Sequence, residues 1–158
     1  MIRGFTPPQE EVPAEIGFQP VPALEAGLIA GVVLLLVPHG SPWSSLTFFS
    51  PVVMGRVIPP SSAIPLPVAW AIHLGISLLF GVFVASTVVR FQRYKAVLIG
   101  GLAGAVLFVA GFGVVSVLFP ELRGGEFSVF FTHVVFGLIA AGAYRGLLRR
   151  KAVMASHA

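Results

Sequence analysis

Apolar residues are gathered into four long stretches, and polar residues lie mostly between them. The stretches cover residues 21–37, 66–89, 96–119 and 127–148. Crossing the hydrocarbon core of a bilayer, about 30 Å thick, takes about 20 mostly apolar residues in a helix. Away from water, a helix satisfies the hydrogen bonds of its own backbone. The pattern therefore predicts an all-α membrane protein with four transmembrane helices.

The composition favours a membrane location over a soluble fold. Of the 158 residues, 56% are hydrophobic and 10% are charged, and the mean hydropathy is +0.95. A soluble domain has about 25% charged residues, so this chain has too few to cover a surface facing water. The net charge of +4 does not indicate nucleic acid, because the basic residues stand at the ends of apolar stretches. The chain has no cysteine, which excludes disulfides and thiolate-bound metals.

The distribution of Lys and Arg predicts the orientation of the helices. Two connections, those after the first and third stretches, contain only Arg56 and Arg123. The segments after the second stretch and around the end of the fourth hold seven basic residues: Arg90, Arg93, Lys95, Arg145, Arg149, Arg150 and Lys151. Cytoplasmic segments carry the excess of positive charge. We therefore expect both termini in the cytoplasm, with residues 1–20 and 149–158 as short tails.

The connection over residues 38–65 is expected on the outer side of the membrane. It contains an apolar segment, residues 43–54, that is too short to span a bilayer. Either this segment lies in the outer interface, anchored by Trp43, Phe48 and Phe49, or it packs over the end of the bundle as a lid.

Glycine spacing predicts close contacts between helices. Pairs four residues apart let two backbones approach, because no Cβ atom stands between them. Three such GxxxG pairs occur: Gly27 and Gly31, Gly100 and Gly104, and Gly142 and Gly146. The spacing does not say whether each pair meets a helix of this chain or of a partner.

The first and third stretches also begin alike, and the second and fourth each carry a histidine followed by Phe-Gly. This likeness indicates either two tandem helical hairpins, related by an axis along the membrane normal, or a chance similarity between apolar helices.

Three histidines are expected toward the outer face, and an ionisable residue inside a membrane calls for a functional hypothesis. His73 and His133 are expected at matching depth, roughly 10 Å below the outer surface, and His39 at the boundary. The two deeper histidines could hydrogen-bond neighbouring helices, ligate a b-type haem, or serve a quinone or proton-transfer site. His39 could add a third nitrogen to a metal site. No carboxylate is expected at that depth, so a proton pathway lacks its usual relay. Among the three interpretations we prefer the structural one, and we expect no cofactor.

No catalytic motif is present. The chain contains no Asp, and no strand–turn–helix elbow surrounds any of its serines. The glycines lie inside apolar helices, where a phosphate would not reach them. The sequence therefore predicts a protein that is not an enzyme.

Several of these features resemble a group of bacterial membrane proteins. The matching positions are Gly27–Gly31, Met54-Gly55, Ala71–His73 with Phe80-Gly81, and Thr132–Gly137 with Tyr144. The chain is similar, over roughly residues 24–148, to the small four-span YagU-like and related uncharacterised families. The resemblance implies four helices in a bacterial inner membrane and supplies no activity.

The leading hypothesis is a non-catalytic accessory subunit of a larger membrane complex, of the respiratory or photosynthetic electron-transport kind. Its partners would be the lipid bilayer and other membrane subunits. Two alternatives remain: a bis-histidine haem or quinone protein using His73 and His133, and a small dimeric transporter.

Overall fold

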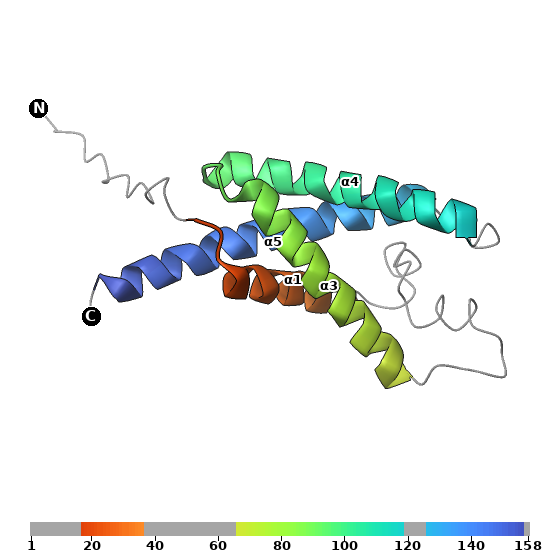
Figure 1. The fold of residues 1–158 in the computed structure, drawn as a ribbon, viewed down its shortest axis with the longest axis horizontal. Helices are drawn as coiled ribbons and strands as arrows, with labels where there is room; N and C mark the ends of the chain where they lie inside the picture. The colour runs from red at the N-terminus through yellow and green to blue at the C-terminus, as the bar shows by residue number, and fades with distance from the viewer. Residues whose placement is uncertain (1–16, 37–65, 119–125, 157–158) are drawn as a thin grey trace, which may run out of the picture.

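The structure of the protein, a computed structural model, describes residues 17–36, 66–118 and 126–156. Its elements are α1 (Pro20–Leu35), α3 (Leu66–Val88), α4 (Arg93–Leu118) and α5 (Glu126–Ala155) (Figure 1). The described residues contain no strand. The prediction of an all-α fold is confirmed.

Three of the helices are long and apolar enough to cross a membrane. Such helices are typical of a membrane protein. Their apolar portions are Trp70–Val88, Tyr94–Val114 and Val129–Ala155. Helix α1 is apolar but has only 16 residues, a length of about 24 Å, against a hydrocarbon core of about 30 Å.

Two helix ends differ from the predicted spans by three residues or more, and the others by two or fewer. Helix α4 begins at Arg93, three residues before the predicted start, and α5 continues to Ala155, seven residues past the predicted end at 148. Arg, Lys, Ala and Met are strong helix formers, and neither Gly nor Pro interrupts residues 149–155. The helix therefore continues where the apolar stretch stops, and most of the predicted C-terminal tail is helical.

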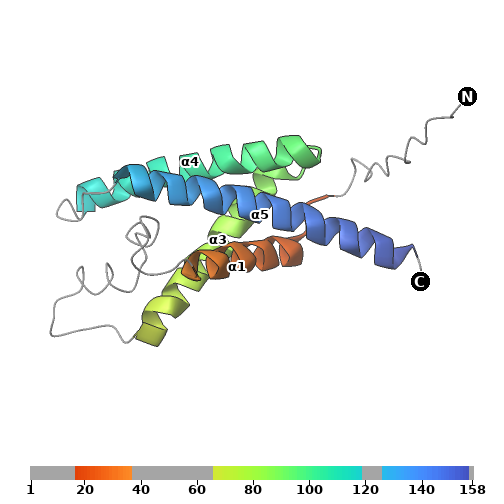
Figure 2. The same ribbon diagram turned by 180° about the vertical axis from the view of Figure 1, so that it is seen from behind.

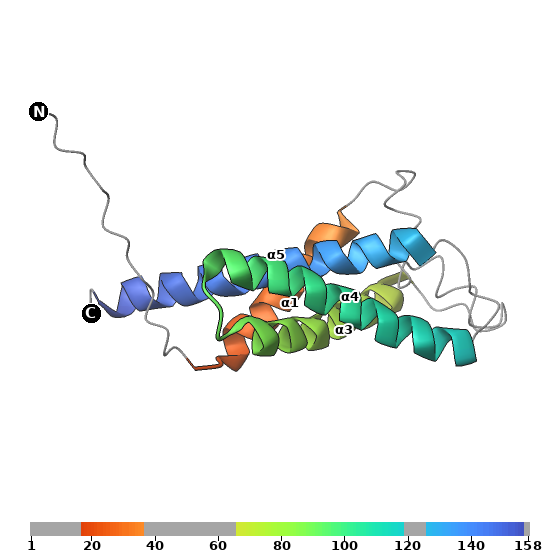
Figure 3. The ribbon, with the colours of Figure 1, turned by 90° about the horizontal axis from the view of Figure 1, so that it is seen from above.

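The four helices form a bundle in which each helix packs on the next one along the chain. Helix α4 packs most extensively on α5, and α1 on α3; α5 closes the ring by packing on α1. Figures 1 and 2 show α4 above α5 on one side and α3 crossing beside α1 on the other. The start of α1, the turn between α3 and α4, and the later part of α5 all lie at one end (Figure 3).

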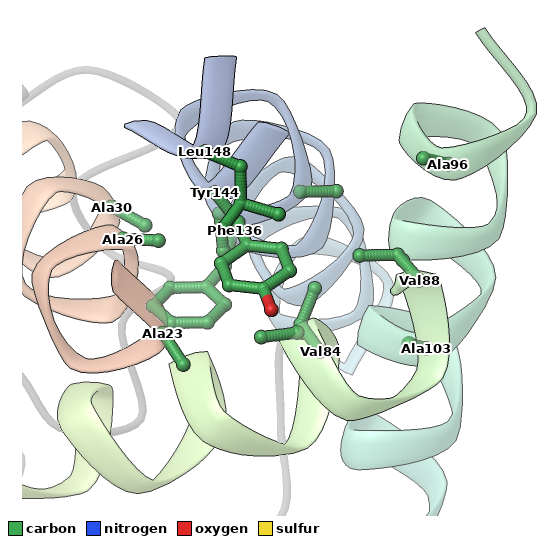
Figure 4. Packing of buried hydrophobic residues seen from close by; sticks show 13 residues of the cluster. Ala23, Ala26, Ala30, Val84, Val88, Ala96, Ala103, Phe136, Tyr144 and Leu148 are labelled. Carbon is green, nitrogen blue, oxygen red and sulfur yellow. The ribbon is translucent and has the colours of Figure 1, made fainter. Parts of the chain in front are cut away.

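The core where the helices meet consists mainly of small residues around two aromatic rings. Phe136 and Tyr144 of α5 point toward α1 and α3, and Tyr144 is fully buried (Figure 4). Around them lie Ala23, Ala26, Ala30, Val84, Ala85, Val88, Ala96, Ala103, Ala140, Ala141 and Leu148. Small side chains let helices approach closely in a membrane, where packing replaces the hydrophobic drive. This cluster therefore joins residues of all four helices.

Candidate functional site

Helices α1 and α3 pack so closely at their glycines that no side chain would fit between the two backbones. A Cβ atom added to Gly27 would come within 3.0 Å of the Ser77 carbonyl oxygen and of Gly81 Cα, and one added to Gly31 would meet the Ser77 side chain. Real Cβ atoms essentially never come that close to a neighbour. This seam, which we call the α1/α3 seam, therefore depends on glycine at positions 27, 31 and 81.

His73 lies in the α1/α3 seam and joins the two helices. Its Nε2 is 3.2 Å from the carbonyl oxygen of Gly31. Because a carbonyl oxygen only accepts, Nε2 carries the proton and donates to it. Ser77 Oγ in turn donates to the His73 carbonyl oxygen at 2.8 Å. The imidazole thus links α3 to the backbone of α1 at Gly31, a position with no side chain to block the bond.

The other ring nitrogen of His73, Nδ1, is buried without a hydrogen bond to any described residue. The His73 side chain is 6% exposed, and its Nδ1 has no hydrogen-bond partner among the described residues. With the proton on Nε2, Nδ1 is an acceptor.

A second seam, between α4 and α5, repeats the arrangement of the first. A Cβ atom added to Gly104 would meet the carbonyl oxygen of His133, and one added to Gly137 would meet the carbonyl oxygen of Gly100. A Cβ atom added to Gly100 would in turn meet Ala141 and the carbonyl oxygen of Gly137. We call this the α4/α5 seam.

His133 lies beside the α4/α5 seam, and its hydrogen bond stays within its own helix. Its Nδ1 donates to the carbonyl oxygen of Val129, one turn earlier on the same helix, at 2.9 Å. Its ring lies 6.0 Å from that of Phe80 and 5.9 Å from that of Phe108, centroid to centroid. The imidazole therefore sits among aromatic rings from α3 and α4.

The two seams correspond position by position, but with a different pairing from the one expected. Gly27 occupies the place of Gly104, since a Cβ atom added at either would meet the carbonyl oxygen of Ser77 or of His133, and Gly81 occupies that of Gly137. Ser77 stands one turn before Gly81, and His133 stands one turn before Gly137. The side chain of each donates a hydrogen bond to the carbonyl oxygen four residues earlier on its own helix. Ser77, rather than His73, is thus the counterpart of His133. The sequence contained this signal, because Ser77 and His133 stand at the same distance before Phe-Gly.

The structure does not place His73 and His133 as a facing pair. Phe80 is the α3 residue beside the His133 ring, and it lies seven residues from His73, a rise of about 10 Å along the helix. One nitrogen of each imidazole is also bonded to a backbone carbonyl. His39 and the predicted anchors Trp43, Phe48 and Phe49 lie outside the described residues.

The third glycine pair has open space beside it. Gly142 and Gly146 are exposed on α5, and a Cβ atom added at either would meet nothing within 4 Å. The structure therefore places two of the three pairs inside the bundle and the third on its surface.

Within the described residues, no group of three or more His, Asp or Glu side chains is placed to hold a metal ion. No protein-family model, curated protein or solved structure matches the chain. The resemblance to YagU-like proteins stays a prediction.

Proposed function

We propose that this protein is a non-catalytic accessory subunit that docks to another membrane protein through the exposed face of α5 at Gly142 and Gly146. The observation that carries the proposal is the contrast between glycine pairs. Gly27 with Gly31, and Gly100 with Gly104, pack against backbone or side-chain atoms, whereas the pair on α5 meets open space. Glycines four residues apart form helix–helix interfaces in membranes, so the α5 pair is suited to a helix from outside the chain.

The use of the histidines supports a structural role rather than chemistry. His73 bonds a carbonyl of a neighbouring helix, and His133 bonds its own helix among aromatic rings. Polar side chains between membrane helices commonly act in this way. The chain then contributes packing surfaces to a complex and leaves its chemistry to other subunits.

For this role the chain would sit in the inner membrane with both termini in the cytoplasm. The basic residues Arg90, Lys95, Arg145 and Arg150 stand at one end of the helices, as the positive-inside rule requires of a cytoplasmic side. Helix α1 packs on α3 and α5 along its length, and a short helix is accommodated in a bilayer by local thinning. Four spans follow from this arrangement.

Purification of the tagged chain from its native membranes in a mild detergent tests the proposal. We expect the wild-type chain to migrate on a native gel with other membrane subunits, and Gly142→Leu with Gly146→Leu to release it from them. Gly75→Leu is the matched control, since Gly75 is also exposed with nothing within 4 Å. A wild-type chain that migrates as an isolated monomer or homodimer would contradict the proposed function.

A further inference from the structure

The packing of the helices sets one end of the bundle at a common level. In the α4/α5 seam, Gly100 lies opposite Gly137 and Gly104 opposite His133. Continuing this antiparallel register brings Arg145 level with the turn between α3 and α4. Independently, the backbone N–H of Gln19 donates to Tyr144 Oη at 3.2 Å, which brings the start of α1 to the same level. Figures 1 and 3 show these three parts together at one end.

Basic residues gather at this level from two parts of the chain that are far apart in sequence. Arg90 and Lys95 flank the α3–α4 turn and are exposed. From α5 come Arg145, which is half-buried, and Arg150 and Lys151, which are exposed. We call these five residues the basic collar. Glu25 is the nearest acidic residue of the described helices, and it lies six residues after Gln19, about 9 Å further into the bundle.

Arg90 and Lys95 of the basic collar stand at the boundary of the apolar parts of α3 and α4. The apolar portion of α3 ends at Val88 and that of α4 begins at Tyr94. Tyr94 is 83% exposed and Phe91 is 38% exposed, and exposed aromatic rings beside a run of apolar residues are typical of the membrane–water interface. The collar therefore stands where phospholipid headgroups lie.

Helix α5 carries the basic surface beyond this boundary. It continues from Leu148, which is buried, to Ala155, a further rise of about 10 Å. On this extension, exposed Val153 and Met154 follow the charges of Arg150 and Lys151. Apolar side chains next to basic ones are suited to a surface that offers both acyl chains and phosphates.

We propose that the basic collar binds the headgroups of anionic phospholipids. Arg side chains form charge-assisted, bidentate hydrogen bonds with phosphate oxygens, and basic residues next to a transmembrane segment attract anionic lipids. Arg90 and Lys95 of the collar are exposed beside the α3–α4 turn, away from the α5 residues Gly142 and Gly146 in the chain, at the level where headgroups are present. Its occupant is therefore a lipid headgroup.

Native mass spectrometry of the full chain in detergent micelles tests this proposal. The probe is an equimolar mixture of phosphatidylglycerol and phosphatidylcholine with identical acyl chains, and the quantity measured is the ratio of the two bound lipids. We expect the wild-type chain to prefer phosphatidylglycerol at least fivefold. A variant with Arg90→Gln, Lys95→Gln, Arg150→Gln and Lys151→Gln should lose most of that preference. Each basic residue near the membrane surface contributes at most about a fivefold factor to the binding of an anionic lipid.

Two controls separate lipid recognition from net charge and from misfolding. Arg56→Gln with Arg123→Gln removes charge from the connections at the other ends of the helices, and it should keep the preference. In the wild-type chain, raising the volatile electrolyte ammonium acetate to about 0.5 M should weaken the preference, because exposed charges are screened; this measurement needs no variant to fold. An absent preference, a preference insensitive to salt and to the collar substitutions, or an equal loss in the control variant would each overturn the proposal.

Discussion

The imidazole of His73 donates from Nε2 to the carbonyl oxygen of Gly31, 3.2 Å away on a different helix. The two residues are 42 positions apart in the chain. Gly31 carries no side chain that could hold α3 away, so its backbone oxygen is open to the imidazole. The bond is therefore both a product of the α1/α3 seam and a support for it.

Replacing His73 with Phe removes this bond while keeping a ring of similar size. Hydrogen bonds between membrane helices are worth about 0.6 kcal/mol on average and up to about 1.7 kcal/mol, and we expect a loss of that order in the free energy of unfolding in detergent. His133→Phe is the control, because His133 bonds only its own helix in the described residues. Equal losses in the two variants would contradict a specific role for His73.

The seam glycines should tolerate no side chain, whereas the exposed glycines should tolerate one. At Gly104 a Cβ atom would collide with the backbone of His133, and at Gly142 it would meet nothing within 4 Å. Overpacking costs about 1–3 kcal/mol, so we expect Gly104→Val to lower the thermal stability of the purified chain and Gly142→Val to leave it unchanged. If both variants unfold at the wild-type temperature, the α4/α5 seam is not packed as described.

Tyr144→Phe should loosen the start of α1. The Tyr144 side chain is fully buried, and its hydroxyl accepts from the backbone N–H of Gln19 at 3.2 Å. Removing the hydroxyl leaves that N–H without this acceptor, at a cost of about 1 kcal/mol. Faster amide hydrogen exchange at residues 19–23 would show the loosening. Tyr94→Phe, at a position 83% exposed, should exchange at the wild-type rate.

We expect the purified, reduced protein to show no Soret band. An axial pair of histidines must point at one iron, whereas His73 faces Gly31 and His133 lies between Phe80 and Phe108. An absorption spectrum after reduction with dithionite is the measurement. A Soret band and a sharp α band, both lost in His73→Ala and in His133→Ala, would instead favour the haem alternative.

The proposed topology makes a distinct prediction for each connection. Alkaline phosphatase inserted within residues 37–65 or 119–125 should be active outside the cytoplasm, and the same enzyme fused after residue 158 should be inactive. Green fluorescent protein at the C-terminus should fluoresce. Alkaline phosphatase fused at the N-terminus tests α1 directly. With the C-terminus inside, the crossings of α3, α4 and α5 place residues 37–65 outside with or without α1, whereas the N-terminus is cytoplasmic, and the fused enzyme inactive, only if α1 also crosses the membrane. Activity of the C-terminal fusion would contradict the orientation.

The sequence by itself determined the helical class and the approximate helix positions. Residues 66–88 and 93–118 contain almost nothing but apolar side chains, and a polypeptide without water as a hydrogen-bond partner satisfies its backbone as a helix. The sequence also identified the glycine pairs, because GxxxG spacing places two glycines on one helix face. Length and hydropathy predicted the end of α5 less well, because the helix continues for seven residues beyond the predicted span and three of these residues are charged.

Only the tertiary structure decided which neighbour each face meets. Three glycine pairs look alike in sequence, and the packing places Gly27–Gly31 and Gly100–Gly104 in seams while Gly142–Gly146 stays exposed. The same is true of the histidines, which the sequence paired by their expected depth in the membrane. Helix rotation and register decide which side chain lies opposite another, and an apolar helix can rotate in lipid at little cost until a close contact fixes it. Here the glycine seams fix it, so that Phe80 rather than His73 lies beside His133.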